Sequence, residues 1–198
     1  MGLLGMTFNA AESFGIATTA SQGTISQEQI QTRPLSRPGE VLETIPGVIV
    51  TQHSGTGKAN QFFLRGFNLD HGTDFATSFD EIPINMVSHA HGQGYTDLNF
   101  LIPELIETIQ YHKGATSIDD GDFASAGTAK ISSIHSLDRP YVQMTLGKND
   151  LLRVLGVGNL QLQNGEIIAA IENLNNDGPW INPENLSKQN VFLKYFSG

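Results

Sequence analysis

The chain has 198 residues, of which 39% are hydrophobic and 16% charged, so it is long enough for one good core and part of a second. A formal net charge of −9 and a pI near 5.0 exclude a nucleic-acid-binding protein, because phosphate contacts need a basic surface. The absence of cysteine excludes disulfide frameworks and thiolate metal sites.

The start of the chain shows no targeting segment. Residues 1–15 have no lysine or arginine and only a broken apolar run, so no signal peptide is visible. No stretch of about 18 apolar residues occurs anywhere, which excludes a transmembrane helix but leaves transmembrane β-strands open, since their signals are short.

The first third of the chain changes from aperiodic to periodic. Residues 1–36 are rich in Ala, Ser, Thr, Gly and Gln, which predicts a mobile lead-in outside the core with a short strand at 23–26. A helix is predicted to begin near Pro38, because proline suits a first helical turn and apolar residues recur on one face behind it. A β-branched strand is predicted at residues 48–51.

Short strands and turns continue to residue 137. Strands are predicted within residues 61–66 and 74–84, and residues 101–115 predict a helical turn that becomes an alternating strand. A last strand is predicted within residues 128–136. Together these segments predict a small mixed α+β domain with short connections.

The pattern changes after residue 138. Val142, Met144 and Leu146 alternate with polar residues, as in a strand with one apolar face. Three further segments of roughly ten residues follow, separated by turn residues. This spacing is typical of membrane-barrel strands, but an ordinary antiparallel sheet produces the same pattern.

Two histidines stand out in the segment SHAHGQGYTDLNF. The spacing of His89 and His91 places both side chains on one side of an extended segment, where both imidazoles could reach one divalent ion. The candidate third ligands are Asp70, His71, Asp74 and Asp97. The alternative is a polar loop whose glycines allow the backbone to turn. No nucleophile, base and orienting group can be assembled, so we expect no enzyme.

Five segments, taken in order, resemble the N-terminal plug domain of TonB-dependent outer-membrane receptors. The resemblance covers about residues 24–137. The segments are RPGEVLETIPGVIV, FFLRGFN, FDEIPIN, LNFLIPELIETIQYHKGATS and GDFASAGTAKISSI. Three features depart from the family pattern: Glu81 replaces a glycine, Lys113 replaces an arginine, and TAKISS lacks a glycine pair.

The resemblance implies an α+β plug domain, with a small mixed sheet and short helices, followed by antiparallel strands of an incomplete transmembrane β-barrel. The expected division is a flexible lead-in at 1–23, a plug at 24–138 and about four barrel strands at 139–198. A barrel open to lipid leaves backbone groups unsatisfied, so we expect an N-terminal fragment or a truncated reading frame.

The implied function is uptake of a scarce nutrient or metal chelate through the Gram-negative outer membrane, with the plug binding substrate and gating the barrel. The implied partner is a TonB-type energy-transducing protein. No segment before residue 24 resembles the box that contacts TonB, so such a box would lie upstream of Met1. No cofactor is expected. The alternative from another class is a soluble periplasmic or secreted β-rich binding module.

The resemblance also implies where substrate binds, because two plug loops of this family face outward. They correspond here to residues 53–60 and 86–97. The candidate substrate-binding residues are His53, Lys58, Asn60, His89, His91, Gln93 and Tyr95. Such groups suit a metal chelate or a polar organic nutrient, and direct metal binding by His89 and His91 is the alternative. Arg65 and Lys113 are expected to pair with acidic groups of the plug or the barrel wall.

Overall fold

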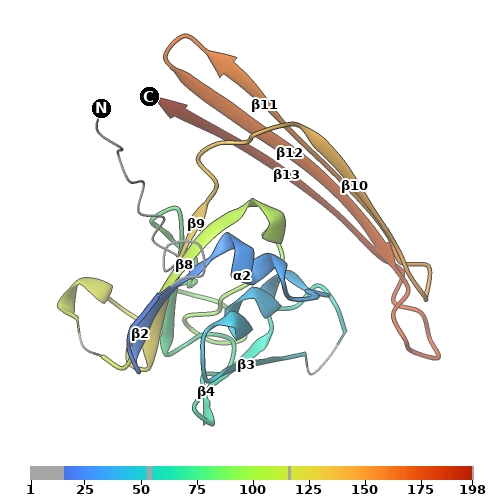
Figure 1. The fold of residues 1–198 in the computed structure, drawn as a ribbon. Helices are drawn as coiled ribbons and strands as arrows, with labels where there is room; N and C mark the ends of the chain where they lie inside the picture. Colours follow the sequence, from blue (N-terminus) through green and yellow to red (C-terminus); the bar gives the residue numbers. More distant parts are fainter. Residues whose placement is uncertain (1–15, 53–54, 116, 198) are drawn as a thin grey trace, which may run out of the picture.

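The computed structural model describes residues 16–52, 55–115 and 117–197, which form an N-terminal body and a C-terminal sheet (Figure 1). The N-terminal body contains a six-stranded sheet with the strand order β1-β2-β8-β9-β6-β7. Its strands are β1 Ile16–Thr19, β2 Gln22–Ser26, β6 Phe75–Phe79, β7 Ile82–Pro83, β8 Ile106–Lys113 and β9 Gly127–Ser133.

This sheet is mixed, because β6 and β9 run parallel while the other neighbours pair antiparallel. A three-stranded antiparallel sheet lies beside it, with β3 Val48–Thr51, β4 Gln61–Leu64 and β5 Phe67–Asn68. The short helices are α2 Gln27–Gln31 and the 3-10 helices η1 Pro38–Thr44, η2 Pro103–Leu105 and η3 Ile118–Asp120. The predicted fold class is confirmed for the body.

The helix predicted at Pro38 is present as η1, and it packs one face into the core. Val41, Leu42 and Ile45 are completely buried there. The helix ends before Gly47, whose positive φ of 88° suits glycine and turns the chain into β3. Burying a side chain of this size stabilises a fold by about 1.5–3 kcal/mol, so η1 is a main anchor of the core.

The N-terminal segment differs from the sequence expectation. Ser26 caps α2 through a capping box with Gln29, and Ile25 and Ile30 are buried in the main core rather than outside it. Within the predicted lead-in, residues 16–19 and 22–26 form strands β1 and β2 of the six-stranded sheet. Isolated helices of five residues are unstable in water, so tertiary packing stabilises this one.

The C-terminal sheet is a four-stranded antiparallel meander that arches over one side of the body (Figure 1). Its strands are β10 Tyr141–Leu146, β11 Leu152–Leu162, β12 Gly165–Asn176 and β13 Leu186–Ser197. The turn between β11 and β12 has only residues 163–164, whereas the connections at the opposite end comprise residues 147–151 and 177–185. The two ends of the sheet therefore differ in the length of their connections.

The two faces of this sheet also differ. One face is apolar and exposed: Val142, Leu146, Val191 and Leu193 are each at least 70% exposed. The predicted alternation in β10 is confirmed by this arrangement. The other face packs on the body through a second core, formed by Ile102, Leu105, Ile134, Leu155, Val157, Ile168 and Ala170. Among the described residues, no helix is both long and apolar enough to span a bilayer.

Candidate functional site

The histidine-containing loop is closed at its base by hydrogen bonds. The backbone N–H of Met86 donates to the carbonyl of Tyr95 at 3.0 Å, and that of Gly94 donates to the carbonyl of Met86 at 2.7 Å. Below them, the buried Asn85 amide donates to the carbonyls of Gly72, Phe75 and Gly94. The segment between Met86 and Gly94 is therefore an exposed loop on a rigid base.

Among the residues that the structure describes, four rings gather beneath and on this loop, and we call them the ring cluster: His71, His89, His91 and Tyr95. The His89 ring stacks on Tyr95 with centroids 4.0 Å apart, and the His91 ring meets His71 edge-on at 4.5 Å. The backbone N–H of His91 donates to Nδ1 of His89. The cluster thus holds His91 over the buried His71.

His71 forms the floor of the ring cluster. Its side chain is 2% exposed, and its Nδ1 lies 2.9 Å from the carbonyl oxygen of Asn60. A carbonyl can only accept, so Nδ1 carries the proton and Nε2 carries the lone pair in the neutral ring. Burial lowers the pKa of His71 below its usual value, although the Asn60 carbonyl and Asp70 act to raise it. The neutral imidazole therefore dominates at pH 7.

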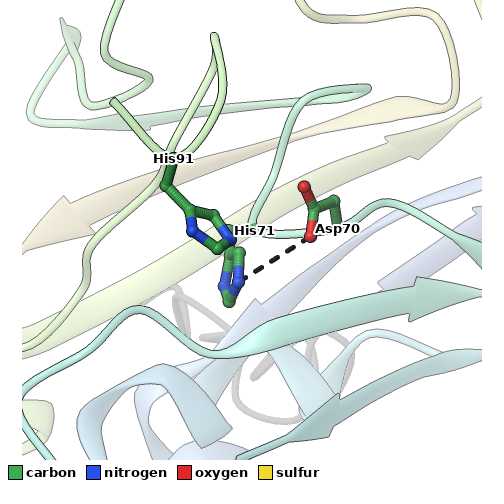
Figure 2. A group of neighbouring side chains, drawn as sticks. All are labelled: Asp70, His71 and His91. Atoms are coloured by element: carbon green, nitrogen blue, oxygen red, sulfur yellow. Dashed lines mark ion pairs between the residues drawn. The ribbon is translucent and has the colours of Figure 1, made fainter. Parts of the chain in front are cut away.

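Asp70 and His91 complete a group with His71 (Figure 2). One ligand atom from each residue can be chosen so that all three lie within 4.8 Å of one another. The Asp70 carboxylate is 3.7 Å from Nε2 of His71 and is half-exposed, and His91 is also exposed. His89 does not belong to this group, because its ring lies against Tyr95.

The two predicted loops are joined to one another. The phenol oxygen of Tyr95 accepts a hydrogen bond from the backbone N–H of Ala59 at 2.8 Å, and the Asn99 amide donates to the carbonyl of Lys58 at 3.3 Å. At the far side of the same loop, Thr56 donates to the carboxylate of Glu184. Residues 55–60 thus bridge the ring cluster and the long connection of the C-terminal sheet.

The predicted substrate-binding residues differ in how exposed they are to solvent. His89, His91 and Gln93 are exposed on the loop, and Lys58 is half-buried. Asn60 is 5% exposed and its amide donates to Gln52, so it supports the loop from inside. Tyr95 is also buried, at 7% exposure, and acts through its stacking and its phenol. His53 lies outside the described residues.

The ion pairs predicted for Arg65 and Lys113 are replaced by other contacts. Arg65 donates to the carbonyl of Ala20 and to the hydroxyl of Ser21, and Lys113 donates to the carbonyl of Pro46 at 3.0 Å. Neither forms a salt bridge with a carboxylate in the part of the chain that the structure describes. Burial and the nearby Arg65 charge lower the pKa of Lys113.

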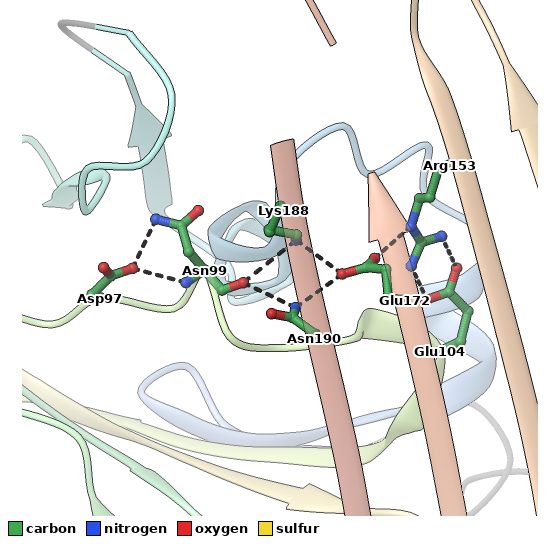
Figure 3. Close-up of polar contacts among 7 residues, drawn as sticks. All are labelled: Asp97, Asn99, Glu104, Arg153, Glu172, Lys188 and Asn190. Atoms are coloured by element: carbon green, nitrogen blue, oxygen red, sulfur yellow. Dashed lines mark hydrogen bonds and ion pairs between the residues drawn. The ribbon is translucent and has the colours of Figure 1, made fainter. Parts of the chain in front are cut away.

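Charge pairing between the body and the sheet comes from other residues, which we call the interface network (Figure 3). The guanidinium of Arg153 in β11 forms a bidentate pair with Glu104 and also donates to Glu172 at 2.6 Å. Glu172, 1% exposed in β12, additionally pairs with Lys188 at 3.0 Å and accepts from Asn190 at 2.9 Å. Both β13 side chains also reach the carbonyl of Asn99.

A second contact joins the body and the sheet near the other end of β13. Lys194 pairs with Asp80 at 2.8 Å, and the hydroxyl of Ser133 lies within hydrogen-bonding distance of both. The inward positions of the strands could have indicated these residues, because charged side chains there alternate with an apolar outer face. Their partners on the body lie far away in sequence.

A cleft of about 1320 Å³ lies between part of the body and the sheet. Its wall includes Glu104, Arg153, Glu172 and Lys188 from the interface network, together with Trp180. None of the three residues in the group of Figure 2 lines it. The ring cluster is therefore a separate place on the molecule.

Comparison with known families identifies the body. A family model described as the TonB-dependent receptor plug domain matches residues 16–128. The chain belongs to the TonB-dependent receptors. Members of this family are outer-membrane transporters of Gram-negative bacteria and not enzymes, which confirms the resemblance, the fold class and the expectation that this chain is not an enzyme.

Solved receptors share the fold at low sequence identity. The copper transporter OprC matches with a TM-score of 0.60 and 18% identity, over 83% of this chain and 25% of that one. A mutant of the ferric enterobactin receptor PfeA from Pseudomonas aeruginosa, in complex with enterobactin, matches with a TM-score of 0.58 and 19% identity. This match covers 82% of the present chain and 26% of PfeA. The siderophore receptor PirA from Acinetobacter baumannii matches with a TM-score of 0.58 and 20% identity, over 81% of the present chain and 25% of PirA. This chain spans about a quarter of the length of each.

Proposed function

We propose that this chain is the plug and adjoining wall of an outer-membrane receptor that takes up a scarce nutrient or a metal chelate. The plug would extend to about residue 138, and the wall would begin at residue 139. Substrate would contact the loops at 53–60 and 86–97, with Lys58, His89, His91 and Gln93 as the accessible side chains. The printed names of OprC, PfeA and PirA refer to copper and siderophores, which agree with a metal-related substrate.

One observation carries the proposal: the two loops meet at the end of the C-terminal sheet that has the longer connections. Tyr95 and Ala59 join the loops, and the hydrogen bonds from Thr56 to Glu184 join them to residues 177–185. In outer-membrane barrels the longer connections face the outside and the short turns face the periplasm. The loops would therefore face arriving substrate.

The exposed face of the C-terminal sheet supports a membrane setting over the rival soluble module. On this face Val191 lies opposite Ile171, and Leu193 lies opposite Ala169, so apolar side chains adjoin across strands. An uncovered apolar face of this kind is unfavourable in water and suits lipid. The face toward the plug carries Arg153, Glu172 and Lys188 instead.

The interface network supports a gating role. A TonB-type partner would pull on the plug, and the contacts that hold the plug to the wall would then break and re-form. Arg153, Lys188 and Lys194 supply those contacts through ionic hydrogen bonds, which can exchange for contacts with water as the cleft fills. Hydrophobic contacts of the second core would separate in the same movement.

The proposal is tested by titrating the purified full chain in detergent with ferric enterobactin and with ferric citrate. Trp180 is the sole tryptophan and lies in the connection that contacts Thr56 through Glu184, so its fluorescence reports on the loops. We expect saturable quenching by at least one chelate, weakened in Lys58→Ala and Gln93→Ala. Gln163→Ala, in the turn at the opposite end, is the matched control. Equal weakening in the control, or no saturable response to either chelate, would contradict the proposal.

A further inference from the structure

We propose that Asp70, His71 and His91 bind one divalent transition-metal ion directly. The inference rests on the proposed function for its physiological meaning, since it names a metal ion as the substrate component recognised at that loop. The site itself stands on the geometry in Figure 2: two imidazoles and one carboxylate converge, with ligand atoms within 4.8 Å of one another.

These separations are close to those of a bound ion. With metal–ligand distances near 2.0–2.1 Å, tetrahedral ligands lie about 3.4 Å apart, so the atoms need to approach by roughly 1.4 Å at most. Asp70 and His91 are exposed and can rotate, whereas His71 is buried and fixed. A small adjustment of two exposed side chains toward one fixed ligand would complete the site.

The tautomer and ring orientation of His71 are those expected of a metal ligand. Its Nδ1 donates to the carbonyl of Asn60, which fixes the ring orientation and leaves the Nε2 lone pair on the side of Asp70. Metal-binding histidines commonly make this second hydrogen bond to a backbone carbonyl. In this tautomer a lone pair faces a carboxylate oxygen, and a cation between them would be attracted to both.

His89 has a different role, contrary to the sequence expectation that it pairs with His91. Its Nδ1 accepts the backbone N–H of His91, and its ring stacks on Tyr95. The neutral ring therefore holds its proton on Nε2 and cannot coordinate through Nδ1 without losing that hydrogen bond. His89 positions the loop that carries His91 without supplying a ligand atom itself.

The donor set selects a class of ion. Two imidazole nitrogens and one carboxylate oxygen suit Zn²⁺, Ni²⁺ or Cu²⁺, whereas Ca²⁺ and Mg²⁺ prefer sites made of oxygen ligands. Three protein ligands leave a fourth position open to water or to a donor atom of an organic carrier. The exposed side of the group, formed by Asp70 and His91, is where that position would lie.

The test is calorimetric titration of the full chain in detergent with Zn²⁺ alone. We expect one site, weakened by more than about tenfold in His91→Ala and in Asp70→Asn, since losing even an outer-shell partner costs about 10- to 100-fold in affinity. His89→Ala should weaken binding less than His91→Ala does, since His89 supplies no ligand atom and acts only by positioning the loop. His135→Ala tests the other exposed imidazole–carboxylate pair, with Glu107.

Each outcome decides the inference. Loss in His91→Ala and Asp70→Asn, with a smaller loss in His89→Ala and unchanged binding in His135→Ala, supports the site. Unchanged binding in His91→Ala, equal loss in His89→Ala, or loss confined to His135→Ala overturns it. His91 and Asp70 are exposed, so their variants should keep the parent circular dichroism spectrum. If Zn²⁺ binds through His91 but neither ferric chelate quenches Trp180, the metal site stands and the proposed chelate receptor fails. If a chelate quenches Trp180 but Zn²⁺ does not bind through His91, the receptor stands and the metal site fails.

Discussion

Removal of the Arg153 guanidinium should be among the most damaging single changes at the interface. Arg153 forms a bidentate pair with Glu104 and a third hydrogen bond to Glu172, whose side chain is 1% exposed. Breaking a buried ion pair from one side costs about 3–5 kcal/mol, because a buried charge is left uncompensated. Lys188 continues to pair with Glu172, so we expect Arg153→Met to cost close to the lower value, about 3 kcal/mol.

The assay is urea unfolding of the full chain in detergent, followed by Trp180 fluorescence. The double variant Arg153→Met with Glu104→Gln should recover part of the loss, since it removes the carboxylate that the single change leaves unpaired. Arg37→Met is the matched control, because Arg37 pairs with Glu40 at 3.4 Å on the surface and should cost at most about 1 kcal/mol. A loss in Arg153→Met no larger than in Arg37→Met would refute the reasoning.

Three further changes test the body and its contacts. Acidification should weaken the interface. Burial acts to raise the pKa of Glu104, but the hydrogen bonds and charge of Arg153 lower it below its ordinary value. Burial likewise acts to raise the pKa of Asp80, but Lys194 and Ser133 lower it below its ordinary value. Their contribution is therefore fully present above the unfolded pKa values and lost as pH falls through the lower folded values, and an unfolding series from pH 7 to pH 3 that stays flat below pH 4 would contradict this. Asn85→Ala should cost about 3 kcal/mol or more, because it leaves several buried backbone groups unpaired; hydrogen exchange of the 86–94 loop should rise with it, and loss of stability without faster exchange would count against Asn85 as the base of the loop. Ser26→Ala should cost about 1 kcal/mol in thermal unfolding through loss of the α2 cap, whereas Ser26→Asp should retain stability, and equal losses would show that the cap is not the cause.

Local pattern was sufficient for most elements of secondary structure. The helix at Pro38, the strand at 48–51 and the alternating strands after residue 140 all occur where periodicity and turn residues placed them. Helix α2 was missed although Ser26 and Gln29 match a capping box, because a five-residue helix leaves almost no periodicity to detect. Its stability comes from the burial of Ile30 in the core.

The sequence by itself determined the family, through five segments in the right order, and it pointed to the loop that carries His91. Only the tertiary structure decided which groups meet there: it places His91 over His71 and Asp70, and turns His89 onto Tyr95. It likewise pairs Arg153 with Glu104, 49 positions away, while Arg65 and Lys113 contact carbonyl and hydroxyl groups. Periodicity reports which face of a strand a residue occupies, but the partner across an interface depends on how separate elements pack, and no local pattern contains that information.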